Sequence, residues 1–239
     1  RRMNYRRFLP NLCTAMNLFF GMCSILSTAE GHLDWAAIFI LLALAADGMD
    51  GRVARALGVS SEFGKEMDSL CDLGSFGIAP ALLAWKLALS SYGLVGAAAA
   101  ICFALCGMWR LTRFNVNVNV VHGYFMGLAI PAGGNLVAMS AWLFLSLGIH
   151  PAAYGFIYPA AVVVTGYLMV SHVHYPDFKG GGERIYFASK LAALVVFAGI
   201  LCVGQTAVLP AVFTAVFAAY AIFGIINHVI ALTAGTKES

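Results

Sequence analysis

Four aspartates stand close together in a chain that otherwise carries few charges. Asp47 and Asp50 are three residues apart. Asp68 and Asp72 are four apart. On a helix either spacing puts both carboxylates on one face, so two antiparallel helices joined by the turn "LGVSSEFG" would direct all four toward one point. Because clustered carboxylates repel one another unless cations separate them, the pattern predicts a site for two divalent ions, Mg²⁺ or Mn²⁺, with Ca²⁺ as a further option. Two such ions about 3.5–4 Å apart are typical of displacement at phosphorus.

The residues between the aspartates fit a phosphate ligand. Gly51 and Gly64 have no side chain, which leaves room for a bulky ligand beside the backbone. Ala54 is small and lies on the same helical stripe, and Arg55 has a fork of donors that suits phosphate oxygens. The alternative is that the basic residues are topology anchors and the aspartates lie in interfacial water. Two facing pairs of carboxylates favour the site.

The composition places these residues in a membrane protein. The chain has 239 residues, of which 61% are hydrophobic and 10% charged, and its mean hydropathy is +0.85. A spanning helix needs about 20 apolar residues. Eight such runs lie near 11–29, 35–57, 70–91, 94–112, 124–148, 153–174, 188–206 and 209–233. The runs are too uniformly apolar for an alternating barrel pattern, so the sequence predicts an all-α polytopic bundle of about eight transmembrane helices, without strands.

The basic residues predict the orientation of these helices. With eight spans, thirteen of the fourteen lysines and arginines fall on one side, and only Lys86 lies near the other. The thirteen are Arg1, Arg2, Arg6, Arg7, Arg52, Arg55, Lys65, Arg110, Arg113, Lys179, Arg184, Lys190 and Lys237. Positive residues stay cytoplasmic, so both termini and the aspartates are expected on the cytoplasmic face of the cell membrane. This bias accounts for the net charge of +3 without a nucleic-acid partner, and the basic rim would also suit anionic lipid head groups.

The aspartate segment also resembles a known motif. The order Asp-x-x-Asp-Gly-x-x-Ala-Arg, eight residues, Gly-x-x-x-Asp-x-x-x-Asp over residues 47–72 is similar to that of the CDP-alcohol phosphotransferase family. The resemblance implies transfer of a phosphatidyl-type group from a CDP-linked lipid to an alcohol, with release of CMP. It implies that the four aspartates surround a two-metal site and that Asp72 is the base for the incoming hydroxyl. It also implies that Gly51, Ala54 and Arg55 line the nucleotide and its phosphates.

The first apolar run begins with a further resemblance. "PNLCTAMN" is similar to the opening segment of the family, which implies that Asn11 and Thr14 touch the nucleotide. The alternative is that these polar residues cap the start of a helix.

Three other stretches point to a subgroup. Residues 106–116, 125–134 and 167–179 resemble the membrane-embedded bacterial phosphatidylserine synthases. The resemblance implies a core over residues 1–180 with about six transmembrane helices, two additional helices over 181–239, and a homodimer. It implies CDP-diacylglycerol and L-serine as substrates, and phosphatidylserine and CMP as products.

Polar residues at the end of the fourth apolar run are consistent with serine as the acceptor. Arg110 and Arg113 are three residues apart at its cytoplasmic end, and Asn115 follows. A guanidinium can bind the serine carboxylate through two hydrogen bonds, and Asn115 can accept from the ammonium or hydroxyl. The alternative is that both arginines are anchors that reach toward the interface.

Two rival functions remain open. The same fold could use glycerol 3-phosphate or inositol as the acceptor, or an archaeal-type lipid as the donor. Carboxylates in a helix bundle can also line the path of an ion or metal transporter. The opposite half of the predicted spans is almost uncharged, which favours a one-sided site over a permeation path.

Overall fold

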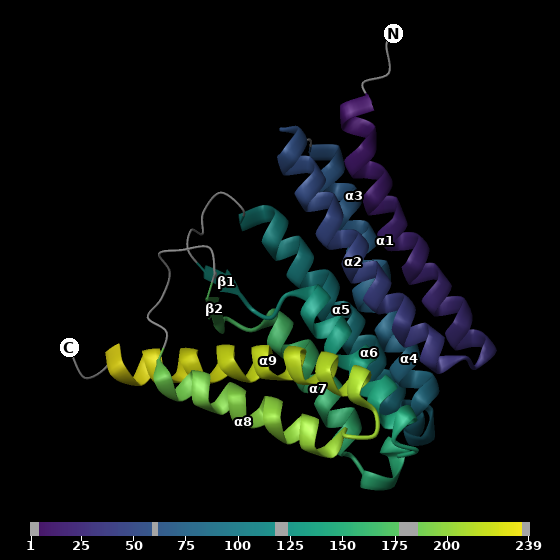
Figure 1. The fold of residues 1–239 in the computed structure, drawn as a ribbon, viewed down its shortest axis with the longest axis vertical. Helices are drawn as coiled ribbons and strands as arrows, with labels where there is room; N and C mark the ends of the chain where they lie inside the picture. The colour runs from purple at the N-terminus through teal and green to yellow at the C-terminus, as the bar shows by residue number, and fades with distance from the viewer. Residues whose placement is uncertain (1–4, 59–61, 118–123, 177–185, 236–239) are drawn as a thin grey trace.

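A computed structural model of the chain describes residues 5–58, 62–117, 124–176 and 186–235, and helices dominate these ranges (Figure 1). The α-helices are α1 (Tyr5–Glu30), α2 (Leu33–Leu57), α3 (Glu62–Asp72), α4 (Ala79–Leu87), α5 (Gly93–Asn117), α6 (Ile130–Ser146), α7 (Ile157–Val170), α8 (Phe187–Val203) and α9 (Val208–Gly235). The π-helix η1 (Leu73–Ile78) joins α3 to α4, and two 3₁₀ turns are η2 (Leu89–Tyr92) and η3 (Pro151–Tyr154). In Figure 1, α1, α2 and α3 run side by side, and α8 and α9 form a hairpin along the lower edge.

The helices lie where the apolar runs predict them. The segment α3–η1–α4 is one continuous helical stretch, and eight helical segments of the described residues therefore correspond to the eight runs. Four of these segments are long and apolar enough to cross a membrane, namely Pro10–Glu30, Glu62–Leu87, Leu89–Val116 and Val208–Thr233. The apolar helices α6, α7 and α8 have only 17, 14 and 17 residues. The helical fold class is thus confirmed, and the count of eight spans stays a prediction.

Two glycines end the first two helices. Gly31 has φ +90° in the short connection between α1 and α2, and Gly58 has φ +62° directly after α2. A residue with a side chain rarely adopts this left-handed conformation, so glycine is the natural helix stop here. The tight turn at Gly31 makes α1 and α2 antiparallel neighbours, which brings Thr14 level with Asp50.

A short β-ribbon departs from the prediction of helices alone. β1 (Tyr124–Met126) pairs antiparallel with β2 (His174–Pro176), and Phe125 lies opposite Tyr175. The predicted apolar runs 124–148 and 153–174 therefore contain less helix than expected. The chain leaves β1 through Gly127 at φ +75°, and α6 begins only at Ile130, with a proline in its first turn. Apolar periodicity cannot distinguish a three-residue strand from the start of a helix.

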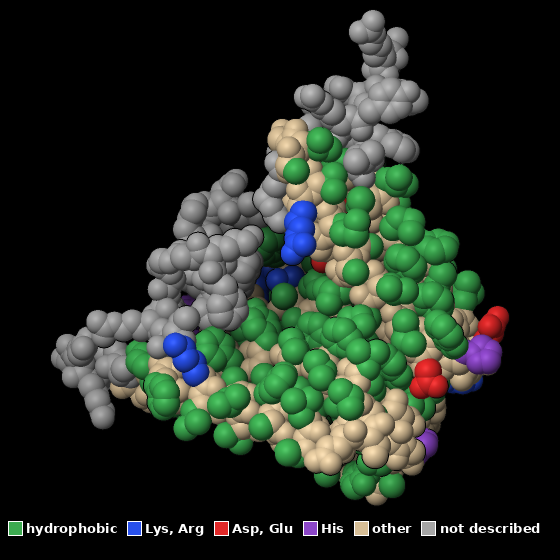
Figure 2. Space-filling view, viewed as in Figure 1, with side chains coloured by type: hydrophobic (Ala, Val, Ile, Leu, Met, Phe, Trp, Pro, Cys, Tyr) green, Lys and Arg blue, Asp and Glu red, His purple; other side chains and the backbone are tan. Residues whose placement is uncertain are grey.

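Small side chains let the helices approach closely in the core. The buried cluster includes Ala36, Ala37 and Ala43 of α2, together with large side chains such as Phe76 and Phe103. Large apolar side chains also face outward, as Leu94 does with 89% of its surface exposed. Hydrophobic side chains cover most of the face in Figure 2, and charged ones are few. An apolar exterior over a close-packed helical core is what a lipid solvent requires.

The π-helix η1 is pressed against α6. An added Cβ on Gly134 would lie 2.4 Å from the carbonyl oxygen of Phe76 and 2.8 Å from its Cα. Both are backbone atoms, so neither can move aside as a flexible side chain would. The contact between α6 and η1 therefore depends on glycine at position 134.

We expect Gly134→Ala to lower the stability of the protein by about 1–3 kcal/mol, because the new methyl group overpacks the contact between the two helices. Gly199→Ala is the matched control, because Gly199 lies in the interior of α8 and no other atom comes within 4 Å of its added Cβ. There, alanine should stabilise the helix by about 0.5–1 kcal/mol. Thermal unfolding in detergent would check both; equal midpoints for the two variants would contradict the packing argument.

Candidate active site

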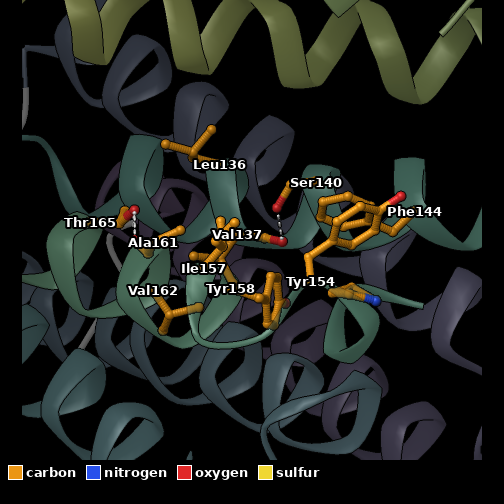
Figure 3. Close-up of a pocket in the computed structure, with 11 residues that line it drawn as sticks. Leu136, Val137, Ser140, Phe144, Tyr154, Ile157, Tyr158, Ala161, Val162 and Thr165 are labelled. Atoms are coloured by element: carbon orange, nitrogen blue, oxygen red, sulfur yellow. Dashed lines mark hydrogen bonds between the residues drawn. The ribbon is translucent and has the colours of Figure 1, made fainter. Parts of the chain in front are cut away.

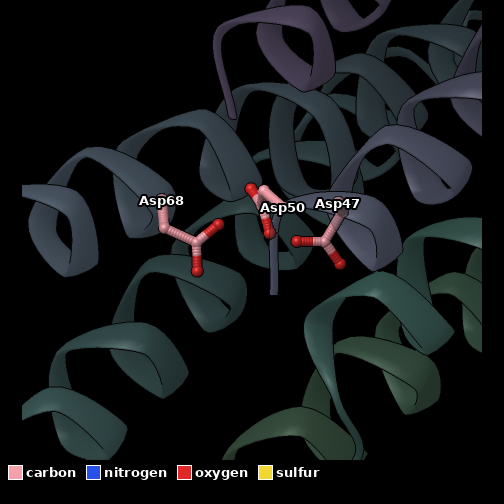
Figure 4. A group of neighbouring side chains, drawn as sticks. All are labelled: Asp47, Asp50 and Asp68. Atoms are coloured by element: carbon pink, nitrogen blue, oxygen red, sulfur yellow. The ribbon is translucent and has the colours of Figure 1, made fainter. Parts of the chain in front are cut away.

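The aspartates of two helices meet at one place. Asp47 and Asp50 lie near the end of α2, and Asp68 lies on α3. One carboxylate oxygen from each of the three lies within 4.8 Å of the other two. Figure 4 shows the three side chains pointing toward one another from their two helices. This cluster of Asp47, Asp50 and Asp68 is called the aspartate trio below.

The trio has the character of a cation site. Asp50 is buried with 7% of its surface exposed, and Asp47 and Asp68 are half-buried. Oδ1 of Asp68 is buried and accepts no hydrogen bond from the described residues. A buried, unpaired carboxylate oxygen beside two more carboxylates is costly, because the charges repel and water is excluded. Hard oxygen ligands at this spacing fit Mg²⁺ or Mn²⁺, and a bound cation would compensate the charge.

Asp72 lies next to the trio, one turn after Asp68. Its side chain is buried with 7% exposed and interacts electrostatically with Asp47 and Asp68. Nδ2 of Asn17 donates a hydrogen bond to Oδ1 of Asp72 at 2.9 Å. Asp72 is therefore a neighbour of the trio with a polar partner of its own. Its direct ligation of a metal stays a prediction.

Helix α1 supplies the polar partners of the aspartates. The hydroxyl of Thr14 donates to Oδ2 of Asp50 at 2.7 Å and is also 3.1 Å from the carbonyl oxygen of Pro10. Asn17 lies three residues after Thr14 on the same face of α1 and is fully buried. The hydroxyl of Ser75 in η1 donates to the backbone carbonyl of Asn17 at 2.9 Å. The sequence interpretation missed Asn17, although a polar residue one turn after Thr14 in an apolar run was an available signal.

The π-helix fixes this arrangement from the other side. η1 begins at the residue after Asp72 and contains Ser75. An added Cβ on Gly21 of α1 would lie 2.3 Å from Oγ of Ser75 and 2.9 Å from its Cα. The close approach of α1 and η1 thus requires glycine at position 21. Single-turn π segments often occur at functional sites, because they change the direction of the side chains that follow.

The other residues that the sequence predicts to bind the nucleotide lie on α1, α2 and α3. Gly51 and Gly64 lie half-buried on α2 and α3, as does Asn11 on α1. The backbone of Ala54 and Arg55 belongs to α2, but their side chains lie outside the described part of the chain. The predicted contacts of these residues with a nucleotide stay predictions.

Arg113 is occupied by backbone carbonyls. Its Nη1 donates to the carbonyl of Val170 at 2.7 Å, and its Nη2 is 3.1 Å from that of Ser171 and 3.2 Å from that of Met126. The last carbonyls of a helix lack partners within it, so Arg113 caps the end of α7 and ties it to β1. This geometry favours a structural role for Arg113 over direct contact with a substrate.

Arg110 is different, because its Nε is buried without a hydrogen-bond partner among the described residues. The side chain has only 7% of its surface exposed, and its guanidinium lies 5.6 Å from the ring centroid of Phe114. It also attracts Asp72 electrostatically. Asn115 lies nearby on α5 and donates from Nδ2 to the hydroxyl of Ser69 at 2.9 Å. A buried cation with a donor that has no partner among the described residues is suited to bind an anionic group.

An apolar cavity of about 420 Å³ lies apart from these groups, between α6 and α7 (Figure 3). Its polar lining includes Ser140 and Thr165, whose hydroxyls donate to the carbonyls of Val137 and Ala161 in their own helices. None of its lining residues is charged. The cavity therefore offers no charged group for catalysis or for metal binding.

We expect Thr14→Val to weaken metal binding, because the variant loses the hydrogen bond that holds Asp50. Loss of a partner that orients a metal ligand typically costs about 10–100-fold in affinity. Titrating activity with Mn²⁺ should show a higher concentration for half-maximal activity, and Thr14→Ser, which keeps the hydroxyl, should restore it. An unchanged Mn²⁺ requirement in Thr14→Val would contradict the role assigned to this hydrogen bond.

Known proteins resemble this chain in sequence. A profile described as CDP-alcohol phosphatidyltransferase matches residues 7–168. The chain is 36% identical over 188 residues to a CDP-diacylglycerol–serine O-phosphatidyltransferase of Helicobacter pylori (strain ATCC 700392 / 26695), covering 78% of each chain. It is 32% identical over 177 residues to the enzyme of that name from Bacillus subtilis (strain 168), covering 74% of this chain and 93% of the other. It is also 37% identical over 176 residues to the archaetidylserine synthase of Methanothermobacter thermautotrophicus, covering 73% and 72%. This chain therefore belongs to the CDP-alcohol phosphatidyltransferase family, the family whose motif its aspartates resemble.

Proposed function

We propose that this protein transfers the phosphatidyl group of CDP-diacylglycerol to L-serine, giving phosphatidylserine and CMP. The observation that carries the proposal is the aspartate trio, with oxygens within 4.8 Å of one another, beside the buried Asp72. Membership of the family supports the reaction class. The serine-specific names of the Helicobacter and Bacillus relatives support serine as the acceptor.

The aspartate trio, with Asp72 as a fourth proposed ligand, would hold two divalent ions, Mg²⁺ or Mn²⁺. When bound, these ions would neutralise the pyrophosphate and stabilise charge on the attacking and leaving oxygens. Two observations support this assignment: Oδ1 of Asp68 is buried with no hydrogen-bond partner within the described ranges, and the three carboxylates lie close together.

The residues of the protein accept the proton of the serine hydroxyl and hold the base in place. The serine hydroxyl oxygen attacks the phosphorus that bears the lipid, and Asp72 takes the hydroxyl proton. As the new oxygen–phosphorus bond forms, the bond from that phosphorus to the bridging oxygen breaks, and CMP leaves with the electron pair. Asn17 keeps the Asp72 carboxylate in one orientation through its 2.9 Å hydrogen bond. Such fixed orientation lowers the cost of reaching the transition state.

Substrate binding is assigned to the flanking residues. Gly51, Ala54 and Gly64 would leave space for the CDP moiety, and Arg55 would bind its phosphates. Asn11 and Thr14 would line the nucleotide from α1. These roles rest on the family motif and on the positions of the residues in α1, α2 and α3.

The acceptor subsite is assigned to the end of α5. Arg110 would bind the serine carboxylate, because its guanidinium is buried and its Nε has no hydrogen-bond partner in the described part of the chain. The amide nitrogen of Asn115 is engaged with Ser69, so the amide oxygen would accept from the serine ammonium or hydroxyl. Arg113 would hold the subsite together through its carbonyl contacts.

The distribution of lysines and arginines along the sequence supports an arrangement of the helices in the membrane. We propose eight transmembrane helices with both termini and the aspartates on the cytoplasmic side of the cell membrane. Residues 1–180 would form the catalytic core, with two added helices over 181–239, and the protein would be a homodimer. Eight of the thirteen basic residues that support this orientation lie in the described ranges, whereas Arg1, Arg2, Lys179, Arg184 and Lys237 lie outside them. CDP-diacylglycerol would enter sideways from the inner leaflet, and serine would come from the cytoplasm.

A second candidate has an ether lipid as the donor. The 37% identity to an archaetidylserine synthase favours it, since that relative is named for an archaeal lipid. The phosphoryl chemistry and the acceptor would be unchanged. Only the hydrocarbon attachment would differ.

An acceptor assay tests the proposed function. Purified protein with CDP-diacylglycerol and Mn²⁺ should incorporate labelled serine into lipid, and chelation of the metal should abolish the reaction. Labelled glycerol 3-phosphate and inositol, and a CDP-linked ether donor, are parallel arms. Label entering lipid only from another acceptor would overturn serine, and metal flux into liposomes without any lipid substrate would favour a transporter.

Asp72→Asn should reduce turnover to background while CDP-lipid binding stays within about a few-fold of wild type. The amide keeps the shape of the side chain but cannot accept the serine proton. Turnover would be measured by CMP release, and binding by equilibrium retention of labelled CDP-diacylglycerol. Glu66→Gln is the control, since it also neutralises a carboxylate of α3 but lies at an undefined position of the motif, with its side chain exposed. Wild-type turnover in Asp72→Asn would exclude Asp72 as the base.

A further inference from the structure

Hydrogen bonds between side chains tie helix α3 to helix α5 beside the aspartates. Helix α3 carries Asp68 of the aspartate trio, and α5 carries the residues proposed to bind the acceptor. Nδ2 of Asn115 on α5 donates a hydrogen bond to the hydroxyl of Ser69 on α3 at 2.9 Å. Ser69 directly follows Asp68 in the chain. This hydrogen bond therefore joins the acceptor end of α5 to a helix that presents a carboxylate of the trio.

A second contact fixes the backbone of Asn115. Nζ of Lys65 donates to the carbonyl oxygen of Asn115 at 3.2 Å. This carbonyl lies in the last turn of α5, where carbonyls have no partner within the helix. A lysine is favourable there, because its charge opposes the negative end of the helix dipole. Lys65 and Ser69 are four residues apart and share one face of α3, so both hold Asn115 from the same side.

The two contacts leave one end of the amide for a ligand. Lys65 fixes the backbone of Asn115 and Ser69 takes the amide nitrogen, so the amide oxygen points away from Ser69. The hydroxyl proton of the acceptor is assigned to Asp72, which leaves the ammonium group of the acceptor as the donor for this oxygen. A hydrogen bond from an ammonium is charge-assisted and therefore stronger than one between neutral groups.

We propose that Ser69 is a positioning residue that makes the acceptor subsite selective for an amino group. Its hydroxyl keeps the amide of Asn115 in the orientation that presents Oδ1 to the ammonium of the acceptor. Position 69 is one of the undefined positions of the aspartate motif, between Asp68 and Asp72. The inference rests on the proposed function, since it concerns the same acceptor, and it adds a contact that the motif does not define.

The selectivity follows from the chemistry of the possible acceptors. Serine carries an ammonium group, whereas glycerol 3-phosphate and inositol have none. The closest comparison is 3-hydroxypropionate, which has the hydroxyl and carboxylate of serine without the amino group. A site that is built to hydrogen-bond one group of a substrate discriminates against an analogue without it, because the polar atom of the site is then left unpaired.

The test is Ser69→Ala in the whole chain, because alanine is a good helix former and removes only the hydroxyl. We expect the KM for serine to rise about three- to tenfold, the effect of losing one hydrogen bond. The KM for CDP-diacylglycerol and kcat at saturating serine should stay at wild-type values. Ser69→Thr keeps the hydroxyl and should restore the KM for serine.

Competition by 3-hydroxypropionate against labelled serine separates selectivity from a general loss of packing. Its inhibition constant should be the same in Ser69→Ala as in the wild type, because it has no ammonium to lose a partner. Thr112→Val is the matched control, since Thr112 is exposed on α5 and its hydroxyl donates to the carbonyl of Met108 within that helix. The control should change neither constant.

A double variant tests whether the effect passes through the amide. In an Asn115→Ala background, Ser69→Ala should raise the KM for serine no further. Three results would overturn the role of Ser69: additive effects, an unchanged KM for serine in the single variant, or an equal rise in the inhibition constant of 3-hydroxypropionate. A wild-type protein that forms no product with serine would overturn the proposed function instead, so the two failures are distinguishable.

Discussion

Repulsion among buried carboxylates is the constraint on which the rest of this structure depends. Three aspartates have oxygens within 4.8 Å of one another, and a fourth lies beside them among apolar helices. Charges at this depth are stable only if they are paired, hydrogen-bonded or neutralised by cations. The neighbouring elements supply hydrogen bonds to Asp50 and Asp72, and Oδ1 of Asp68, which has no partner among the described residues, leaves charge compensation to a ligand.

The hydrogen-bond donors that steady the aspartates come from α1. Thr14 and Asn17 can reach Asp50 and Asp72 only because α1 approaches α2 and η1 closely. The approach of α1 to η1 depends on Gly21, which leaves space for Ser75, and on the other side of η1 Gly134 of α6 leaves space for the backbone of Phe76. In lipid there is little hydrophobic gain from bringing helices together, so close packing at small residues is a main source of their association. Packing in this protein therefore determines the chemistry of the site.

The two arginines of α5 show how similar residues acquire different tasks. Arg113 donates to carbonyls at the end of α7 and in β1, so its guanidinium holds these two elements together. Arg110 is more deeply buried, attracts Asp72 electrostatically, and has one donor, Nε, to which no described residue offers an acceptor. The difference arises from their neighbours, because the end of α7 lies against one guanidinium and the aspartates lie near the other.

The sequence alone determined the helical class, the positions of the helical segments and the convergence of Asp47, Asp50 and Asp68. These features depend on local composition and on spacing along a helix, which a sequence displays directly. Only the tertiary structure decided that α1 holds Asp50 and Asp72 through Thr14 and Asn17, that Arg113 caps α7, and that Tyr175 joins the ribbon to α9. It also decided the short ribbon itself, which the sequence did not predict. The physical reason is that these contacts join residues from 36 to 58 positions apart in the chain, and no local periodicity encodes which distant backbone or side chain will meet them.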